Sequence, residues 1–385
     1  MKICVVTGTR AEYGLLKPLI SAIQSEAGWT LQVLATGAHL SPEFGLTYKI
    51  IENDGFKIDR KVEMLLSADT STSIVKSMGL GMIGYADALQ DLAPDLIVIL
   101  GDRYEMLSVA SSAMIYNIPI VHIHGGEVTE GAYDDAIRHS ITKMSHLHFA
   151  STEEYRKRII QMGENPDNVY NVGAIGLDSV KNLPLLNREE LEEQLGVKFR
   201  KYNYQVTFHP STLDVETPEN QFRVLLNAIE KQEDSFFVFT KSNADTGGRI
   251  INQMIDDFVQ KNPATAAAFT SLGNLRFLSV VKVCDAMVGN SSSGILEAPS
   301  LKTATINIGN RQKGRIQAET VVNTEVDEQQ ILDAFEKVKT ESFKKQVELS
   351  ENPYGKGNSS GQIIEVLRNA DPNNYKTKHF FDINN

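Results

Sequence analysis

Short apolar runs alternate along the chain with longer segments in which apolar residues recur at helical spacing. This alternation is typical of βα units, in which parallel strands are connected by helices. In the first half it predicts helices at Glu12–Ser25 and Asp134–Met144, and strands at Lys2–Thr7, Leu31–Thr36, Leu96–Leu100, Ile118–Ile123, Leu147–Ala150 and Val169–Val172. We therefore expect an open, doubly wound α/β sheet.

The alternation resumes after a connection that ends in a charged segment, predicted to be helical, at Arg188–Leu195. The pattern then predicts strands at Tyr204–Phe208, Phe236–Thr240, Ala286–Gly289 and Thr303–Ile308, and helices at Glu219–Lys231, Gly248–Lys261 and Glu328–Lys345. Open α/β sheets bind ligands outside the carboxyl ends of their strands. We expect two domains, residues 1–175 and 176–368, with an interdomain cleft, followed by a loosely packed polar tail at 369–385.

Composition narrows the classes of partner. The 38 basic and 49 acidic side chains give a net charge of −11, which disfavours nucleic acids and anionic membranes. No apolar run approaches the roughly 18 residues needed to cross a bilayer, and the amino terminus lacks the features of a signal peptide. We expect a cytoplasmic protein. Cys4 and Cys284 lie in strand-like apolar runs and are expected to be buried thiols. Because the net charge is negative, an anionic ligand must be held by a few well-placed groups.

Polar residues close several strands of the first domain. Arg10 follows the first strand at a helix start, where it could meet a phosphate or simply face solvent. That turn is neither a P-loop nor a dinucleotide-binding motif. The strands ending at Leu100 and Ile123 lead into Gly101, Asp102 and Arg103, and into His124, Gly125, Gly126 and Glu127. Polar groups at the ends of apolar strands cost desolvation unless they are paired, so these residues indicate a site.

Two adjacent carboxylates, Asp134 and Asp135, open a predicted helix, and Arg138 and His139 follow one turn later. Helix capping would explain one of the two acids. A second acid beside an arginine and a histidine leaves room for a general acid or base whose pKa is tuned by its neighbours. The sequence does not decide which aspartate has which role.

In the second domain a serine-rich turn follows a predicted strand. Ser291, Ser292 and Ser293 lead into a helix with Glu297, and hydroxyls and N–H groups at a helix start can hold an anion while an acid nearby takes a ribose diol. His209 closes another strand of this domain. Arg311, Lys313 and Arg315 add cations after the next strand. No His, Cys or Asp cluster has metal-ligand spacing, so neither a metal nor a cofactor is predicted.

Together these motifs resemble the UDP-N-acetylglucosamine 2-epimerase family. The resemblance rests on Gly8-Thr9-Arg10, Gly101-Asp102-Arg103, His124-Gly125-Gly126-Glu127, Asp134 to His139, His209-Pro210, Gly289 to Gly294 with Glu297, and Arg311 to Arg315. Within the family, the Asp-Asp-x-Ile-Arg-His run resembles that of the hydrolysing enzymes, whose product enters sialic acid synthesis. The resemblance implies a GT-B-like fold of two Rossmann-like domains, with UDP bound mainly by the second.

The resemblance also implies roles for individual residues. It implies that Ser291, Ser292 and Ser293 hold the diphosphate, that Glu297 binds the ribose, and that Arg10 and Arg311 meet the phosphates or their closure loop. Asn243 would be a further nucleotide contact, and Arg103 would lie on the substrate side. His209, beside the departing phosphate, belongs to the implied catalytic set. Asp102 and Asp134 match catalytic acids of the family. The C2 base stays open among Glu127, Asp134 and His124, because His124 stands where well-studied members of the broader family have glutamate.

The reaction implied is anti elimination of UDP to give 2-acetamidoglucal, followed by syn hydration to N-acetylmannosamine. Alternatives are a non-hydrolysing epimerase, a retaining glycosyltransferase, a nucleotide-sugar sensor, or a hydrolysing enzyme acting on UDP-2,4-diacetamido-2,4,6-trideoxyglucose for legionaminic acid. The resemblance further implies a homodimer or homotetramer that assembles through the first domain.

Overall fold

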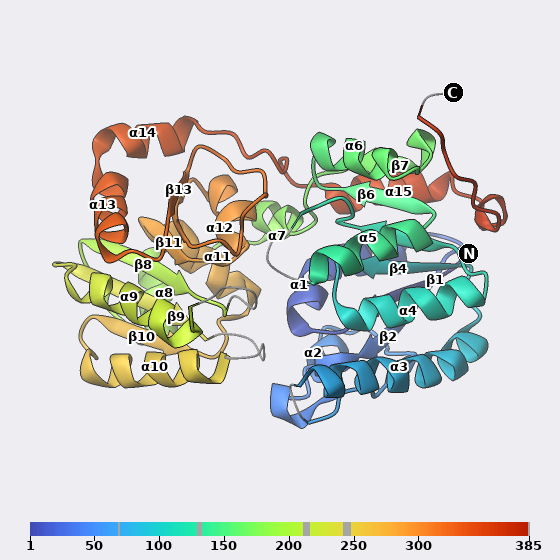
Figure 1. The fold of residues 1–385 in the computed structure, drawn as a ribbon, viewed down its shortest axis with the longest axis horizontal. Coiled ribbons are helices and arrows are strands. Elements are labelled where there is room, and N and C mark those ends of the chain that lie inside the picture. The colour runs from blue at the N-terminus through green and yellow to red at the C-terminus, as the bar shows by residue number, and fades with distance from the viewer. Residues whose placement is uncertain (68–69, 129–132, 211–215, 242–247, 384–385) are drawn as a thin grey trace. The chain divides into compact units, whose positions relative to one another are not determined.

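The computed structural model describes residues 1–67, 70–128, 133–210, 216–241 and 248–383, which form two compact units (Figure 1). The first unit contains Met1–Glu127, Tyr133–Ser179 and Gly357–Asn385, and the body of the second is Val180–Lys356. Each unit is built around one parallel sheet with helices on both faces. No helix in the described ranges is long and apolar enough to span a bilayer.

The sheet of the first unit has seven strands in the order β3-β2-β1-β4-β5-β6-β7. The strands are β1 (Lys2–Thr7), β2 (Thr30–Thr36), β3 (Arg60–Val62), β4 (Leu96–Leu100), β5 (Ile120–Ile123), β6 (Leu147–Ala150) and β7 (Val169–Asn171). The helices are α1 (Arg10–Ser25), α2 (Tyr48–Asn53), α3 (Ser71–Leu92), α4 (Tyr104–Ile115), α5 (Asp134–Met144), α6 (Glu153–Gln161), α7 (Leu177–Asn182) and α15 (Ser359–Arg368). The order reverses between β1 and β4, so the sheet is doubly wound.

Both faces of this sheet are apolar, because consecutive residues of its strands are apolar and their side chains point alternately to opposite sides. Ile3 and Val5 of β1 belong to a core cluster with residues of α1 and α15. Cys4 and Val6 belong to the other cluster, with residues of α3 and α4. Burial raises the pKa of the Cys4 thiol, as expected for a small core residue.

The sheet of the second unit has six strands in the order β10-β9-β8-β11-β12-β13. The strands are β8 (Tyr202–Thr207), β9 (Ser235–Thr240), β10 (Ala266–Phe269), β11 (Ala286–Gly289), β12 (Ala304–Ile308) and β13 (Val321–Thr324). The helices are α8 (Arg188–Leu195), α9 (Pro218–Glu230), α10 (Gly248–Lys261), α11 (Gly273–Val283), α12 (Ser293–Leu296), α13 (Glu328–Lys339) and α14 (Glu341–Leu349). Tyr204, Phe237 and Phe335 pack ring against ring in its core, with centroids 4.9–6.3 Å apart. The predicted architecture of two doubly wound α/β units is confirmed.

The long helix predicted at Glu328–Lys345 is wrong, because the structure divides it into α13 and α14. Thr340 adopts extended backbone angles, and its hydroxyl accepts a hydrogen bond from the N–H of Phe343. A threonine in this position caps a new helix and ends the preceding one. The apolar spacing continues through the break, which is why periodicity alone did not reveal it.

The end of the chain also differs from the prediction, because residues 357–385 belong to the first unit. Ile363, Ile364 and Leu367 of α15 are buried in the core cluster that contains α1, and Arg368 forms two hydrogen bonds with Glu26 at the end of that helix. The domain expected at 176–368 therefore loses its last helix to the first unit. The expected loose tail is docked as well, through contacts of Lys378 described below.

Candidate active site

In the first unit, Asp102 and the first turns of α5 meet at the carboxyl ends of the strands. Asp102 follows β4, and its carboxylate forms an ion pair with Arg138, whose side chain is only 3% exposed. Nη1 of Arg138 lies 3.5 Å from Oδ1 of Asp135. Asp134 is the first residue of α5 and is half-buried. One buried guanidinium thus joins the predicted acid after β4 to the acidic start of α5.

His124 and Glu127 form a buried pair in the loop after β5. The backbone N–H of Ile175 donates to Nε2 of His124 at 3.2 Å, so that nitrogen is an acceptor and Nδ1 carries the proton of the neutral ring. Nδ1 lies 3.3 Å from Oε1 of Glu127, which also accepts from the hydroxyl of Ser151 at 2.8 Å. Glu127 is 2% exposed. Both ring nitrogens of His124 are therefore engaged within the protein.

His122, the other histidine of this segment, is a core residue. Its ring contacts the carbonyl of Gly101 through Nε2 at 2.8 Å and the hydroxyl of Thr142 through Nδ1 at 3.2 Å. Burial lowers its pKa to about 3, so the ring is neutral at pH 7. His122 ties the end of β4 to α5 and does not face a ligand.

Two buried glutamates for which the sequence predicted no role, Glu12 and Glu105, hold the turn after β1 and the loop after β4, respectively. Oε2 of Glu12 accepts the N–H groups of Gly8 and Thr9 at 2.8 and 2.9 Å, which completes a capping box on α1. Burial raises the pKa of Glu12 to about 7. Arg103, predicted on the substrate side, makes two hydrogen bonds at 3.1 and 3.2 Å to the fully buried Glu105. The spacing of Thr9 and Glu12 could have revealed the capping box from sequence.

Arg10 is the first residue of α1, and its side chain is exposed. The amides of Gly8 and Thr9 before it already donate to Glu12. An anion at this helix start would therefore be met by the guanidinium of Arg10 rather than by those two N–H groups.

In the second unit, Asn290 joins three of the predicted motifs. Its side chain accepts the N–H of His209 at 2.7 Å and donates to the carbonyl of the same residue at 2.8 Å. Its own carbonyl accepts from Nη1 of Arg311 at 3.0 Å and from Gln312 at 2.9 Å. The loops after β8, β11 and β12 are thereby held in one arrangement. Asn290 lies within the motif from Gly289 to Gly294, but the sequence predicted no role for it.

The serine turn lies directly against the sheet. A Cβ on Gly294 would come within 2.6 Å of Thr305 in β12, and the hydroxyl of Thr305 donates to the carbonyl of Gly294 at 2.7 Å. Only glycine permits this close approach. The half-buried residues of the turn are Ser291, Ser292 and Ser293, and the buried Glu297 follows α12. Asn243 lies outside the described residues.

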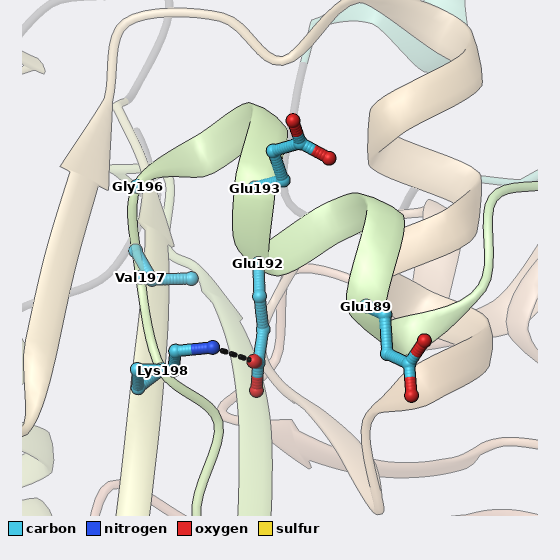
Figure 2. A pocket seen from close by; sticks show the side chains of 6 residues that line it. All are labelled: Glu189, Glu192, Glu193, Gly196, Val197 and Lys198. Carbon is cyan, nitrogen blue, oxygen red and sulfur yellow. Dashed lines mark hydrogen bonds and ion pairs between the residues drawn. The ribbon is translucent and has the colours of Figure 1, made fainter.

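Two surface pockets of the structure contain none of the predicted site residues. One, of about 440 Å³ beside α8 in the second unit, is lined by Glu189, Glu192, Glu193, Gly196, Val197 and Lys198. Figure 2 shows its three glutamates, of which Glu192 is paired with Lys198 at 2.6 Å. Its excess of carboxylates would repel a diphosphate. The other lies in the first unit and includes Met1, Asp95 and Lys376.

Comparison with known proteins decides the family. A model of the family described as UDP-N-acetylglucosamine 2-epimerase matches residues 21–368. The chain belongs to this family. The resemblance seen in the sequence motifs is confirmed.

Two relatives match nearly the whole length of the chain. A Campylobacter jejuni protein named "GDP/UDP-N,N'-diacetylbacillosamine 2-epimerase (hydrolyzing)" is 46% identical over 383 residues, with 99% of each chain covered. "Polysialic acid biosynthesis protein P7" of Escherichia coli is 40% identical, with 99% of this chain and 97% of the relative covered.

The fold of the epimerase family is also seen in solved structures. UDP-GlcNAc 2-epimerase from Neisseria meningitidis, crystallised with UDP-GlcNAc, superposes with a TM-score of 0.80 at 20% identity, covering 96% of this chain and 100% of that one. The predicted GT-B-like fold of two Rossmann-like domains is confirmed.

Proposed function

We propose that this protein is a hydrolysing UDP-sugar 2-epimerase that converts UDP-N-acetylglucosamine and water to N-acetylmannosamine and UDP. The observation that carries the proposal is the buried Arg138, which holds Asp102 beside the acidic first turn of α5. Removing a proton from a sugar carbon needs a fixed carboxylate, and Asp134, the first residue of that helix, would be this base on a rigid support. The names of the relatives supply the reaction class.

We assign UDP binding to the second unit. Ser291, Ser292 and Ser293 would donate to the diphosphate, Arg311 would balance its charge, and Glu297 would accept from the ribose hydroxyls. His209 would stand beside the departing phosphate. The bonds of Asn290 to His209 and Arg311 support this assignment, because they fix both groups before the ligand arrives. Asn243 stays a proposed nucleotide contact on the family resemblance alone.

We assign the sugar chemistry to the first unit. A carboxylate takes the C2 proton, the C1–O bond breaks with its electron pair leaving on UDP, and water then adds across the glycal to release the free sugar. Asp102, 23% exposed, and the half-buried Asp134 are the groups that would touch the substrate, as the family resemblance implies. His124 and Glu127 are buried against each other and serve as positioning residues. Arg10 and Arg103 complete the proposed substrate side.

A second substrate is favoured by a specific observation. The Campylobacter relative is named for N,N'-diacetylbacillosamine, the common name of 2,4-diacetamido-2,4,6-trideoxyglucose. The same elimination and hydration act at C1 and C2 of that sugar, so the residues assigned above would serve it unchanged. The polysialic acid relative favours UDP-N-acetylglucosamine.

The deciding experiment incubates the protein separately with each UDP-sugar in D₂O and identifies the products by NMR. Free N-acetylmannosamine with deuterium at C2, together with UDP, is expected from UDP-N-acetylglucosamine. Faster turnover of the diacetamido sugar would reassign the substrate but keep the reaction. A UDP-linked 2-epimer would show a non-hydrolysing enzyme, and turnover of neither sugar would contradict the proposal in favour of a transferase or a sensor.

We further propose that the protein is a homodimer or homotetramer that assembles through α3 and α4. Val75, Met82 and Ile83 of α3 and Met114 and Ile115 of α4 are all exposed, Ile115 by 77% and Ile83 by 68%. The two helices pack against each other in the first unit, and we propose that these exposed side chains form the interface. Apolar surface of this kind is typical of protein–protein interfaces.

A further inference from the structure

The carboxyl-terminal tail binds the carboxyl end of α5, the helix whose other end carries Asp134, Asp135 and Arg138. Nζ of Lys378 donates to the carbonyls of Lys143 at 2.8 Å, of Thr142 at 3.4 Å, and of Ser145. The last carbonyls of a helix have no partner within it and carry its negative dipole end. An ammonium group at this position therefore stabilises α5 through both hydrogen bonding and charge.

The ammonium group of Lys378 is itself held by a buried acid. Oε2 of Glu164, whose side chain is 3% exposed, lies 2.7 Å from Nζ of Lys378 and 2.9 Å from Nε2 of His148. Oε1 of the same carboxylate lies 2.6 Å from Nζ of Lys143, the last basic residue of α5. The tail, α5 and the loop after α6 thus share one ion-pair network.

A second contact anchors the tail beside that network. The ring of Phe380 occupies the space over Gly163, where a Cβ would come within 2.4 Å of it, and the N–H of Phe381 donates to the carbonyl of Gly163 at 3.0 Å. Lys143 lies 4.9 Å from the centre of the Phe380 ring. Figure 1 shows the tail continuing past α15 along the end of α6. The tail is therefore fixed at Lys378 and at the residues directly after it.

A short chain of contacts links this end of α5 to the proposed active site. The hydroxyl of Thr142 donates to the carbonyl of Arg138 at 3.0 Å and contacts Nδ1 of His122 at 3.2 Å. Arg138 in turn holds Asp102. With 11 residues α5 is about 16 Å long, and a rigid tilt about its middle would move both ends by similar distances.

We propose that Lys378 is a positioning residue for the reaction: by fixing the carboxyl end of α5, the tail sets Asp134 and Arg138 against Asp102. The inference rests on the proposed function of the first unit. Lys378 acts through α5 and touches no substrate. Misplacing a catalytic group by about 1 Å can cost about 100-fold in rate, so even a small tilt matters.

The pH dependence of turnover distinguishes this role from a merely structural one. Burial lowers the pKa of Lys378 from 10.5 to about 8, although Glu164 opposes the shift. The titratable groups that face it are Glu164, Lys143, His146 and His148. Because the folded pKa lies below the unfolded one, losing this proton above pH 8 does not reduce folding stability. Turnover is expected to fall above about pH 8 without a matching fall in Tm.

The test compares Lys378→Met with Lys376→Met, a matched change at an exposed lysine of the same tail. Lys378→Met is expected to lower kcat by about 10-fold or more and to leave KM within about 2-fold, while Lys376→Met has no effect. Lys378→Arg is expected to restore most of kcat and to move the alkaline limb to higher pH, since guanidinium does not titrate there. UDP affinity, assigned to the second unit, should be unchanged in all three.

Wild-type kcat in Lys378→Met, or an unshifted alkaline limb in Lys378→Arg, would overturn the inference. The proposed function fails separately, if the wild type turns over neither UDP-sugar. In that case, the rate of amide hydrogen exchange in α5 still tests the role of Lys378, because it does not depend on enzyme activity. Lys378→Met is expected to speed exchange in Ile137–Ile141, in the middle of α5, whereas faster exchange confined to the last turn of α5 would contradict transmission along the helix.

Discussion

The two neighbouring carboxylates at the start of α5 are both half-buried, and we propose a separate role for each of them. Asp135 faces Arg138 and His139, each at 3.5 Å, and so belongs to the ion-pair network of the helix. Asp134 precedes it as the first helical residue and is half-buried. We propose that Asp134 acts on the substrate, as the family resemblance implies, and that Asp135 supports Arg138.

Substituting these two residues one at a time tests the assignment. Asp134→Asn is expected to lower kcat for UDP release by about 100-fold or more, as for loss of a general base. Asp135→Asn keeps the shape and one hydrogen-bond acceptor, and is expected to cost about 10-fold or less. Rapid-quench measurement of UDP, with deuterium uptake at C2, follows the chemical step directly. Equal losses in the two variants would show that the pair acts as a unit.

At the scale of elements, the contacts around Glu164 join α5, β6, α6 and the tail. Burial alone would raise the pKa of Glu164, but its bonds from His148, Lys143 and Lys378 outweigh that effect and lower the pKa to about 2. The carboxylate therefore contributes stability that is fully present above its ordinary pKa of 4.5 and is lost as the pH falls towards 2.

Glu164→Gln is expected to reduce the stability of the first unit at pH 7 and to remove this part of its acid sensitivity. The difference from wild type should shrink steadily between pH 4.5 and about 2, because wild type also loses the charge there. Urea unfolding can be followed through Trp29, the one tryptophan of the chain, which packs against the core of the first unit. A difference independent of pH would contradict the assignment.

At the scale of the whole molecule, the exposed apolar residues of α3 and α4 predict self-association. Ile83→Glu is expected to shift the protein from dimer or tetramer to a smaller species, because a carboxylate buried at an interface without a partner is costly. Ile250→Glu, at a 40% exposed isoleucine of α10 in the second unit, is the matched control and should not change the mass. Sedimentation velocity measures both. A monomeric wild type would refute the proposed assembly.

Much of the fold could be predicted from the sequence because its signals are local. The strands at Lys2–Thr7, Leu96–Leu100 and Ala286–Gly289 have the predicted bounds, since buried parallel strands are continuous apolar runs. The candidate site residues could be found because polar groups at the ends of such strands stand out. Periodicity did not detect the break at Thr340, where the apolar spacing continues while the backbone does not.

Local patterns in the sequence predict the class of the fold and the loops in which chemistry is expected. Three contacts are seen only in the folded chain: Glu127 and His124 are buried against each other, and Arg138 holds Asp102. In the third, Lys378 binds the carbonyl of Lys143 at the end of α5, although the two residues are 235 positions apart. The spacing of residues along a chain indicates which face of its own helix or strand a residue occupies. Its partner across the core depends on contacts between distant segments, which no local pattern encodes.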